Sequence, residues 1–234
     1  MKNYFLYLML FVTFSFFSQD QQQSKKGDYN IDYLGNFNKA GMWLPASVED
    51  KSISGSPYLF NSWEELFSVI NKKGNRFDIL NLNYNILTKK LESKVSKDSV
   101  FQYDLKDIDK VKYLSKVYTV KNEELFLQLF SSDSFEFLKS FQVVIQEPVS
   151  NPLTQSQLTP RRYIYKNEYK VFQNGVIADF KLNKKSLFNL FPDKIDLIKN
   201  YANSNKLSFN EETDVVKIFN YIVNNLKNLK TQLL

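Results

Sequence analysis

Carboxylates are the only side chains of this sequence that could serve as ordinary general acids or bases, because its 234 residues include no cysteine and no histidine. A Ser-His-Asp triad, a thiolate nucleophile, a disulfide and a lipid-acylated cysteine are therefore excluded, as is a metal site built from histidine or cysteine. The acidic residues gather at Glu64–Glu65, at Asp107 with Asp109, and at Glu123–Glu124. Adjacent residues of a strand point to opposite faces, so the first and third clusters do not make catalytic pairs there.

The pair Asp107 and Asp109 could instead suggest a calcium loop. It lacks the glycine and the terminal glutamate that such a loop requires. Solvated charge is the simpler interpretation of all three clusters. We therefore expect no metal and no cofactor, and we assign no catalytic residue.

Amide and aromatic side chains form the candidate binding site. Asn81, Asn83 and Asn85 alternate with apolar residues, which predicts an exposed row of amides on one face of a strand. Amides can donate and accept hydrogen bonds, so this row could bind a sugar or a peptide strand. Tyr58 and Trp63 could stack on a glycan ring. The alternatives are a merely solvated strand face and rings packed in the core or at its edge.

The composition indicates a folded, strand-rich protein. Hydrophobic residues make up 43% of the chain and aromatic residues 16%, which is too apolar for disorder and favours strands. The net charge of +6 comes mostly from lysine, with arginine only at positions 76, 161 and 162. Because readers of nucleic acid depend on the arginine fork, no nucleic-acid partner is expected. Six glycines leave no Gly-rich phosphate loop.

The N-terminus has the pattern of a secretory signal peptide. Lys2 precedes an apolar run over residues 4–17, which is shorter than the roughly 20 residues that a membrane-spanning helix needs. We expect cleavage near Ser18 or Gln19, with an uncleaved anchor as the alternative. Residues 1–18 are then the signal peptide. The mature protein would be exported, periplasmic or extracellular, and would not span the membrane.

The pattern of residues 19–50 predicts a weakly ordered leader, whose one apolar patch, at residues 42–45, is expected to pack on the domain edge.

The pattern of residues 51–234 predicts a single β-rich domain with a C-terminal helical pair. Strand-like runs cover residues 66–70 and 76–87, joined as a hairpin by a loop containing Gly74. Further strand-like runs follow at 91–95, 100–105, 111–114, 117–120, 125–130 and 135–145, of which the last could be helical.

A loop over residues 147–160 precedes the most regular part of the sequence. Runs at 163–165, 169–172 and 176–182 predict three antiparallel strands. Their turns are expected at residues 166–168 and at Asn174–Gly175, the second being a strong signal for a tight hairpin.

Helical periodicity then replaces the alternation. A short helix over residues 184–190 ends before Pro192, and Asp193 is expected to cap a second helix that carries Ile198 and Ala202. Ser208 and Glu211 have capping-box spacing before a last helix, whose apolar stripe predicts that it is docked. The stripe comprises Val215, Ile218, Phe219, Ile222, Leu226 and Leu229. The fold class is α+β: an antiparallel β-meander, as a sandwich or an open barrel, followed by C-terminal helices.

Four segments resemble a family of uncharacterised exported proteins from flavobacteria-type bacteria. They are residues 55–63, 81–86, 151–154 and 205–209. The resemblance implies a location in the cell envelope. It transfers no functional residue.

These patterns together favour a non-enzymatic envelope protein that acts by binding or assembly and offers a sheet edge or face to a protein or glycan partner. One alternative is a carboxylate-dependent hydrolase of envelope polymers, which two carboxylates facing one another in a cleft would favour. The other is a carrier of an apolar ligand, which an apolar cavity of at least about 300 Å³ would favour. The oligomeric state is left open.

Overall fold

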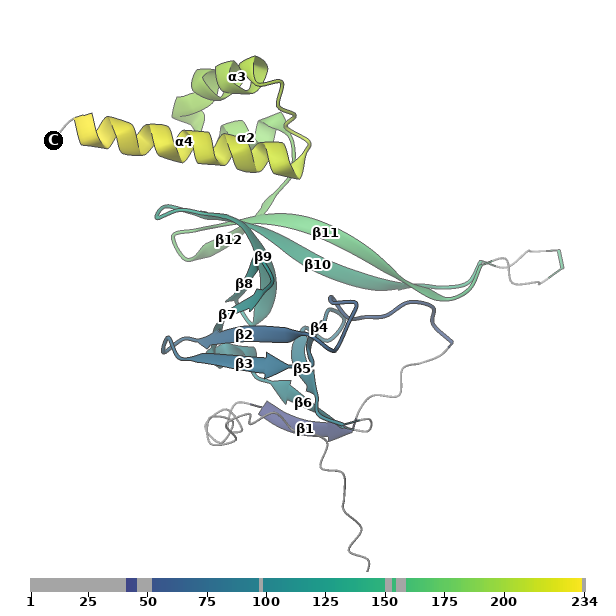
Figure 1. Ribbon diagram of the computed structural model, residues 1–234. Coiled ribbons are helices and arrows are strands. Elements are labelled where there is room, and N and C mark those ends of the chain that lie inside the picture. Colours follow the sequence, from purple (N-terminus) through teal and green to yellow (C-terminus); the bar gives the residue numbers. More distant parts are fainter. Residues whose placement is uncertain (1–40, 46–51, 97–98, 150–152, 155–158, 233–234) are drawn as a thin grey trace, which may run out of the picture.

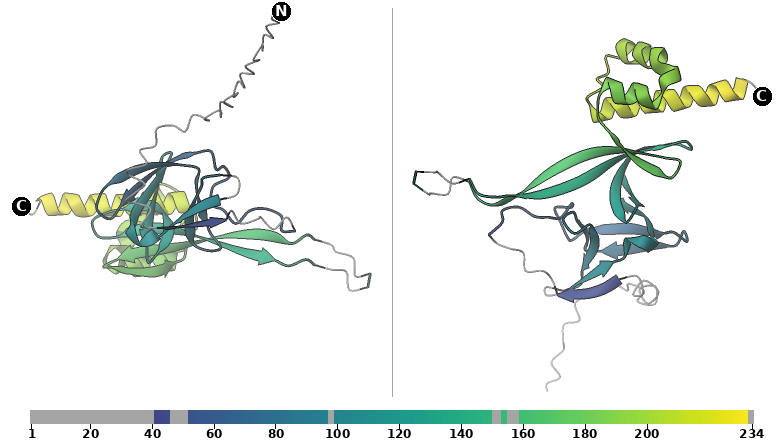
Figure 2. Two further views of the ribbon diagram at one scale, coloured as in Figure 1. Left: turned by 90° about the horizontal axis from the view of Figure 1, so that it is seen from below. Right: turned by 180° about the vertical axis from the view of Figure 1, so that it is seen from behind.

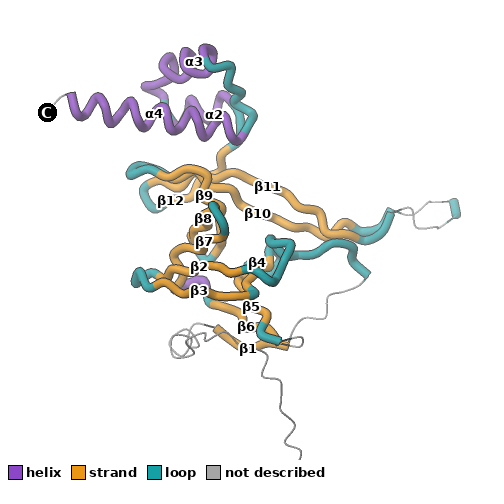
Figure 3. Tube along the Cα trace, in the orientation of Figure 1, coloured by secondary structure: helices purple, strands orange, loops and turns teal. Residues whose placement is uncertain are grey.

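The computed structural model describes residues 41–45, 52–96, 99–149, 153–154 and 159–232 of the chain. The predicted signal peptide and most of the predicted leader lie outside the described residues. The described chain forms two antiparallel sheets followed by helices, so the predicted α+β class is confirmed (Figures 1 and 3).

The larger sheet has eight strands in the order β12-β11-β10-β9-β8-β7-β2-β3. They are β2 (Leu66–Asn71), β3 (Arg76–Leu80), β7 (Ile108–Tyr113), β8 (Lys116–Lys121), β9 (Glu124–Ser131), β10 (Glu136–Gln146), β11 (Arg162–Gln173) and β12 (Val176–Phe180). The hairpin predicted between residues 66–70 and the following run is present as β2 and β3.

The smaller sheet has four strands in the order β1-β6-β5-β4. They are β1 (Gly41–Pro45), β6 (Ser99–Tyr103), β5 (Lys90–Lys94) and β4 (Leu82–Asn85). Part of the predicted leader is therefore an edge strand, and Trp43 of β1 packs its ring against Phe101 at 5.1 Å between centroids.

The chain changes sheet at Asn81. We expected one strand over residues 76–87, but Asn81 has φ 58°, a left-handed conformation that interrupts the extended chain. Residues before it belong to β3 and residues after it to β4. The chain returns to the larger sheet through a 3₁₀ turn, η2 (Leu105–Asp107).

The first hydrophobic core lies between the two sheets. Its largest fully buried side chains include Phe67 of β2, Tyr84 of β4, Leu91 of β5, Ile108 of β7 and Leu125 of β9. Phe60 joins this core from the segment before β2, with its ring centroid 4.8 Å from that of Phe67. Both sheets thus share one set of apolar residues.

The strands β10 and β11 form one long hairpin. They pair without interruption from Glu136 opposite Phe172 to Gln146 opposite Arg162. Residues 135–145 are therefore in a strand rather than a helix, and the turn predicted at residues 166–168 is wrong. The polar triplet there resembles a turn, but every one of its residues faces a partner on β10. The second predicted turn is confirmed: Asn174 and Gly175 have φ 51° and 79° between β11 and β12.

Three helices follow, α2 (Lys184–Leu190), α3 (Ile195–Ser204) and α4 (Glu212–Gln232), with a 3₁₀ turn η3 (Pro192–Lys194) between the first two. The predicted bounds of α2 are confirmed, and its start is capped by the side chain of Asn183, which accepts from the Ser186 N–H at 2.8 Å. Asp193 does not cap α3, because it lies within η3.

The start of α4 differs from the predicted capping box. The Ser208 N–H donates to the carboxylate of Asp214 at 3.0 Å, and the Ser208 hydroxyl accepts from the Asn210 N–H at 3.2 Å. Asp214 therefore takes the role expected of Glu211. The backbone N–H of Ser208, followed by the neighbouring Lys217, holds the pKa of the Asp214 carboxyl below its ordinary value.

The second core joins the helices to one end of the larger sheet, which confirms that α4 is docked. Val215, Ile218, Phe219 and Ile222 of its stripe are buried, while the side chains of Leu226 and Leu229 lie outside the described part. The Phe219 ring lies 5.1–6.0 Å from five other phenylalanine rings. They belong to Phe130, Phe135, Phe137, Phe180 and Phe191.

Candidate functional site

The predicted row of exposed asparagines is not exposed. Asn83 is 0% and Asn85 8% accessible, and all four residues of β4 are buried. The side-chain oxygen of Asn83 accepts from the Phe60 N–H at 3.0 Å, and its amide donates to the Phe60 carbonyl at 2.8 Å. Asn81 donates to the Lys94 carbonyl at 3.2 Å. These amides bind the protein's own backbone.

The cover over this edge comes from residues 57–60. The Leu59 N–H donates to the Tyr84 carbonyl and the Ile86 N–H donates to the Pro57 carbonyl, each at 2.9 Å. This segment therefore extends the smaller sheet beyond β4 and hides the edge. At Phe60 this backbone pairing ends, and the side chain of Asn83 supplies an acceptor to the Phe60 N–H and a donor to the Phe60 carbonyl.

Tyr58 and Trp63 do lie together, at 4.7 Å between ring centroids and in an edge-to-face arrangement. The Tyr58 ring is only 7% exposed, which favours the packing alternative over a platform for a sugar. Its hydroxyl donates to Glu92 at 2.7 Å, and Gln102 donates to the other oxygen of the same carboxylate at 3.1 Å. The structure thus joins Tyr58 to a buried glutamate that lies opposite Asn83 in the ladder, with Trp63 packed on the Tyr58 ring.

Sequence reasoning missed Glu92 because a lone glutamate in the stretch Lys-Leu-Glu-Ser-Lys gives no motif. The available signal is its register, since Glu92 lies opposite Asn83 on one side and Gln102 on the other. Burying a carboxylate is costly unless hydrogen bonds compensate. The two neutral donors provide that compensation, so this cluster braces the sheet.

Of the three carboxylate clusters of the sequence, Glu123–Glu124 pairs with lysines, and Asp109 lies 3.9 Å from Lys110. Glu124 accepts from Lys89 at 2.8 Å and from the Ser140 hydroxyl at 3.2 Å. Glu123 lies 3.9 Å from Lys106. Within the described ranges, no group of three or more acidic, histidine or cysteine residues could hold a metal ion.

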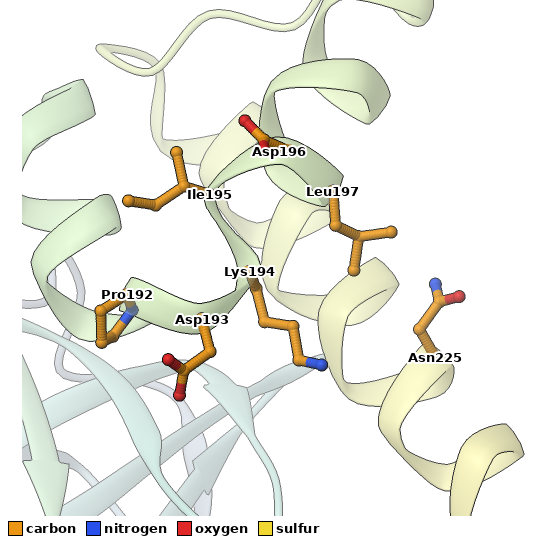
Figure 4. A pocket seen from close by; sticks show the side chains of 7 residues that line it. All are labelled: Pro192, Asp193, Lys194, Ile195, Asp196, Leu197 and Asn225. Carbon is orange, nitrogen blue, oxygen red and sulfur yellow. The ribbon is translucent and has the colours of Figure 1, made fainter.

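The described surface includes two hollows whose linings bear on the hydrolase and carrier alternatives. The larger, of about 700 Å³, lies between the start of α3 and Asn225 of α4, and Asp193 and Asp196 point away from one another at its wall (Figure 4). The smaller, of about 270 Å³, lies over β2, β3 and β7, where Arg76 pairs with Asp78 at 3.1 Å. Neither hollow brings two carboxylates face to face, and charged side chains line both.

The most distinctive surface is the outer part of the β10–β11 hairpin, residues 140–149 and 159–168, which we call the arm. The strand β9 pairs with β10 only as far as Lys139, and β12 pairs with β11 only from Tyr169. Beyond these points the two strands continue alone and project past the rest of the sheet (Figures 1 and 2).

The arm carries exposed apolar residues together with arginine. Val144, Val149 and Tyr165 are exposed, and Leu153, in the connection at the tip, is 93% exposed. Arg161 pairs with Glu147 at 3.0 Å, and Arg162 donates to Gln146 at 2.8 Å. Apolar, aromatic and arginine side chains are the types enriched in protein interfaces.

One side of the arm is supported by the segment that follows residue 51. The Ser54 N–H donates to the Arg161 carbonyl at 2.9 Å, and the Tyr163 N–H donates to the Ser54 carbonyl at 3.0 Å. The Tyr165 hydroxyl donates to the Tyr58 carbonyl at 3.1 Å. This support holds β11 in place, although an isolated two-stranded hairpin is only marginally stable in water.

Comparison with models of known protein families, with curated proteins and with solved structures finds no match to this chain. The resemblance to exported flavobacterial proteins therefore stays a prediction. No helix in the described ranges combines the length and the apolarity that crossing a bilayer requires.

Proposed function

We propose that this chain is an exported, non-enzymatic binding or assembly protein of the cell envelope, and that it holds a protein partner through the arm. The observation that carries the proposal is the arm itself: a paired, supported hairpin that projects beyond the sheet and exposes Val144, Val149 and Tyr165. The signal-peptide pattern over residues 1–18 supports export.

The arm fits a protein better than a glycan. Sugar sites rely on several exposed aromatic faces, whereas the described arm exposes the aliphatic Val144 and Val149 beside one exposed aromatic residue, Tyr165. Exposed apolar side chains on a hairpin that projects from the body are typical of a contact surface. Neither of the two hollows supports the hydrolase or the carrier, because neither brings two carboxylates face to face and charged side chains line both.

Cross-linking in intact cells tests the proposal. The full chain is compared, after fractionation of the envelope, with a variant that removes the exposed aliphatic side chains of the arm and of its tip, Val144→Ser with Val149→Ser and Leu153→Ser. We expect the native chain to form a cross-linked adduct that the triple variant loses, since all three residues are exposed and their replacement leaves both cores intact.

The matched control is Leu114→Ser with Val176→Ser. Both residues are exposed apolar positions, on β7–β8 and on β12, away from the arm. The control should keep the adduct. Equal adducts for the arm variant and the native chain, or retention of the chain in the cytosol with its N-terminus intact, would overturn the proposal.

A further inference from the structure

The arm has one backbone edge that the described chain leaves unpaired. Tyr163 uses its N–H toward Ser54, which lies outside the hairpin, so Tyr163 directs its backbone groups away from β10. In an antiparallel ladder, the opposite residue of such a pair also directs its groups outward. That residue is Ile145. Since the direction of the backbone groups alternates along a strand, Phe141 and Val143 also direct their N–H and C=O groups away from β11.

These three residues present three N–H and three C=O groups along the side of β10 that β9 has left. The pairing of β9 ends at Lys139 opposite Leu127. In the described part of the chain, no strand or hydrogen bond reaches Phe141, Val143 or Ile145 from that side. Such a row of free groups is a template for another strand.

This edge lacks the features by which sheet edges usually resist association. Residues 140–146 read SFQVVIQ, with no charge, no proline and no glycine, and with β-branched residues at three positions. The outermost strands of the larger sheet differ, because β3 carries Arg76 and Asp78 and β12 carries Asp179.

We propose that a second copy of this chain pairs with the edge, so that two β10 strands lie antiparallel about a two-fold axis through Val143. This inference rests on the proposed function of the arm and gives the arm its partner. Val143 lies opposite Val143 of the partner subunit, and Phe141 lies opposite Ile145 of the partner subunit. The six free groups then find six complementary groups on the partner.

The side chains suit this symmetry. Phe141, Val143 and Ile145 share one face by alternation, and on that face Phe141 and Val143 pack in the core between the sheets of their own subunit, so the two-fold axis sets two apolar faces side by side. On the other face, Gln142 lies opposite the partner's Val144, and no charged side chain of β10 meets another. The basic residues Arg162 and Lys166 lie on β11, at least about 14 Å from their copies, the distance that three strand spacings give. This separation exceeds the screening length of about 8 Å.

Only five residues of each strand can overlap before the chain meets β9, so the dimer should be weak. Small interfaces belong to transient assemblies. We therefore expect the dimer fraction of the purified mature chain to rise with concentration in sedimentation velocity.

The variant Ile145→Pro should abolish dimerisation. The Ile145 N–H points to the free edge, so proline removes an outward donor and leaves the ladder to β11 intact. The control Val176→Ser should dimerise as the native chain does. Circular dichroism confirms that both variants keep the fold.

Disulfide trapping tests the register directly, because the chain has no cysteine of its own. An equimolar mixture of Gln142→Cys and Val144→Cys chains should oxidise to a mixed dimer, since these positions face one another at about 4.5 Å between Cα atoms. A Val176→Cys chain, with an exposed thiol on β12, should remain monomeric.

The outcomes separate this inference from the proposed function. A native chain that stays monomeric at every concentration, without a mixed disulfide, overturns pairing with a second copy. Cellular adducts that depend on the arm but contain a different protein would also overturn it, while leaving the proposed function standing. If no cross-linked adduct of any kind depended on the arm, both this inference and the proposed function would be wrong.

Discussion

Asn83 acts as a substitute for backbone at the place where residues 57–60 stop pairing with β4. Its amide joins the N–H and the carbonyl of Phe60, two groups that are otherwise buried. Asn83→Ala would leave both groups without a partner, at a cost of about 1–3 kcal/mol each. We expect a loss of about 2–6 kcal/mol in the free energy of unfolding, measured by urea denaturation.

The control is Asn61→Ala, because Asn61 is exposed two residues before Trp63. Its effect should stay within about 0.5 kcal/mol. A stability of Asn83→Ala equal to that of the control would show that the bonds to Phe60 contribute nothing.

The prediction for Asn81, Asn83 and Asn85 also shows what an alternating sequence pattern can and cannot establish. The pattern over residues 80–86 correctly indicates an extended chain around Asn83, but it does not reveal what covers each face. The cover comes from Phe60, which is 23 residues earlier in the chain. Propensity likewise gave no warning that Asn81 would break the strand, although asparagine is among the residues that tolerate positive φ.

At the scale of single elements, the β11–β12 turn gives a direct test of backbone strain. Asn174 and Gly175 both have positive φ, and a Cβ added to Gly175 would meet no atom within 4 Å. Replacing both residues by valine would therefore act through conformation rather than through a clash. We expect a loss of about 1–3 kcal/mol per residue in thermal or chemical unfolding.

Asn174→Gly serves as the comparison for that turn, because glycine adopts positive φ without strain. It should unfold within about 0.5 kcal/mol of the native chain. If the valine pair unfolded at the native midpoint, the strained conformation assigned to this turn would be wrong.

The docking of α4 depends most on Phe219, whose ring lies among five other phenylalanines and is fully buried. Phe219→Ala removes this ring and leaves a cavity that the rigid sheet cannot fill. The expected cost is about 3–5 kcal/mol in the free energy of unfolding. Asn224→Ala, on the exposed side of α4, should change it by less than about 0.5 kcal/mol. Equal effects would mean that α4 does not complete this core.

Helices and turns were predictable from the sequence where one local signal dominates. They were not predictable where pairing with a segment distant in the chain determines the conformation. Periodicity and Pro192 gave the bounds of α2, and Asn174–Gly175 gave the last hairpin. The triplet at residues 166–168 is polar enough for a turn, but pairing with β10 keeps it extended. The start of α4 was misplaced because Ser208 bonds to Asp214 rather than to Glu211.

At the scale of the whole molecule, one hairpin joins the two cores. Phe137, Phe141 and Val143 alternate along β10 and share one face, yet Phe137 packs in the core under the helices while Phe141 and Val143 pack between the sheets. The residues that anchor the arm are therefore continuous with both cores. Force or strain on the arm is transmitted to packed residues, which suits a surface that holds a partner.

The buried tyrosines make the whole fold sensitive to alkali. Burial raises the pKa of Tyr103, Tyr118 and Tyr169 to about 12, and a hydrogen bond to Glu212 adds to the effect at Tyr169. In the unfolded chain these phenols ionise near pH 10. Between about pH 10 and 12 the unfolded state therefore holds fewer protons than the native state, and stability falls as pH rises.

We expect the urea midpoint to be constant below about pH 9 and to decrease steadily above pH 10, with phenolate absorbance appearing together with unfolding. Tyr118→Phe keeps the ring in the core between the sheets and removes one raised pKa, so its midpoint should decrease less over the same range. The loss should also begin at the same pH in both chains, because the unfolded phenols set its onset. Phenolate absorbance that developed fully near pH 10 in a chain still folded by circular dichroism would contradict the burial of these hydroxyls, and with it the packing of the two cores around β10.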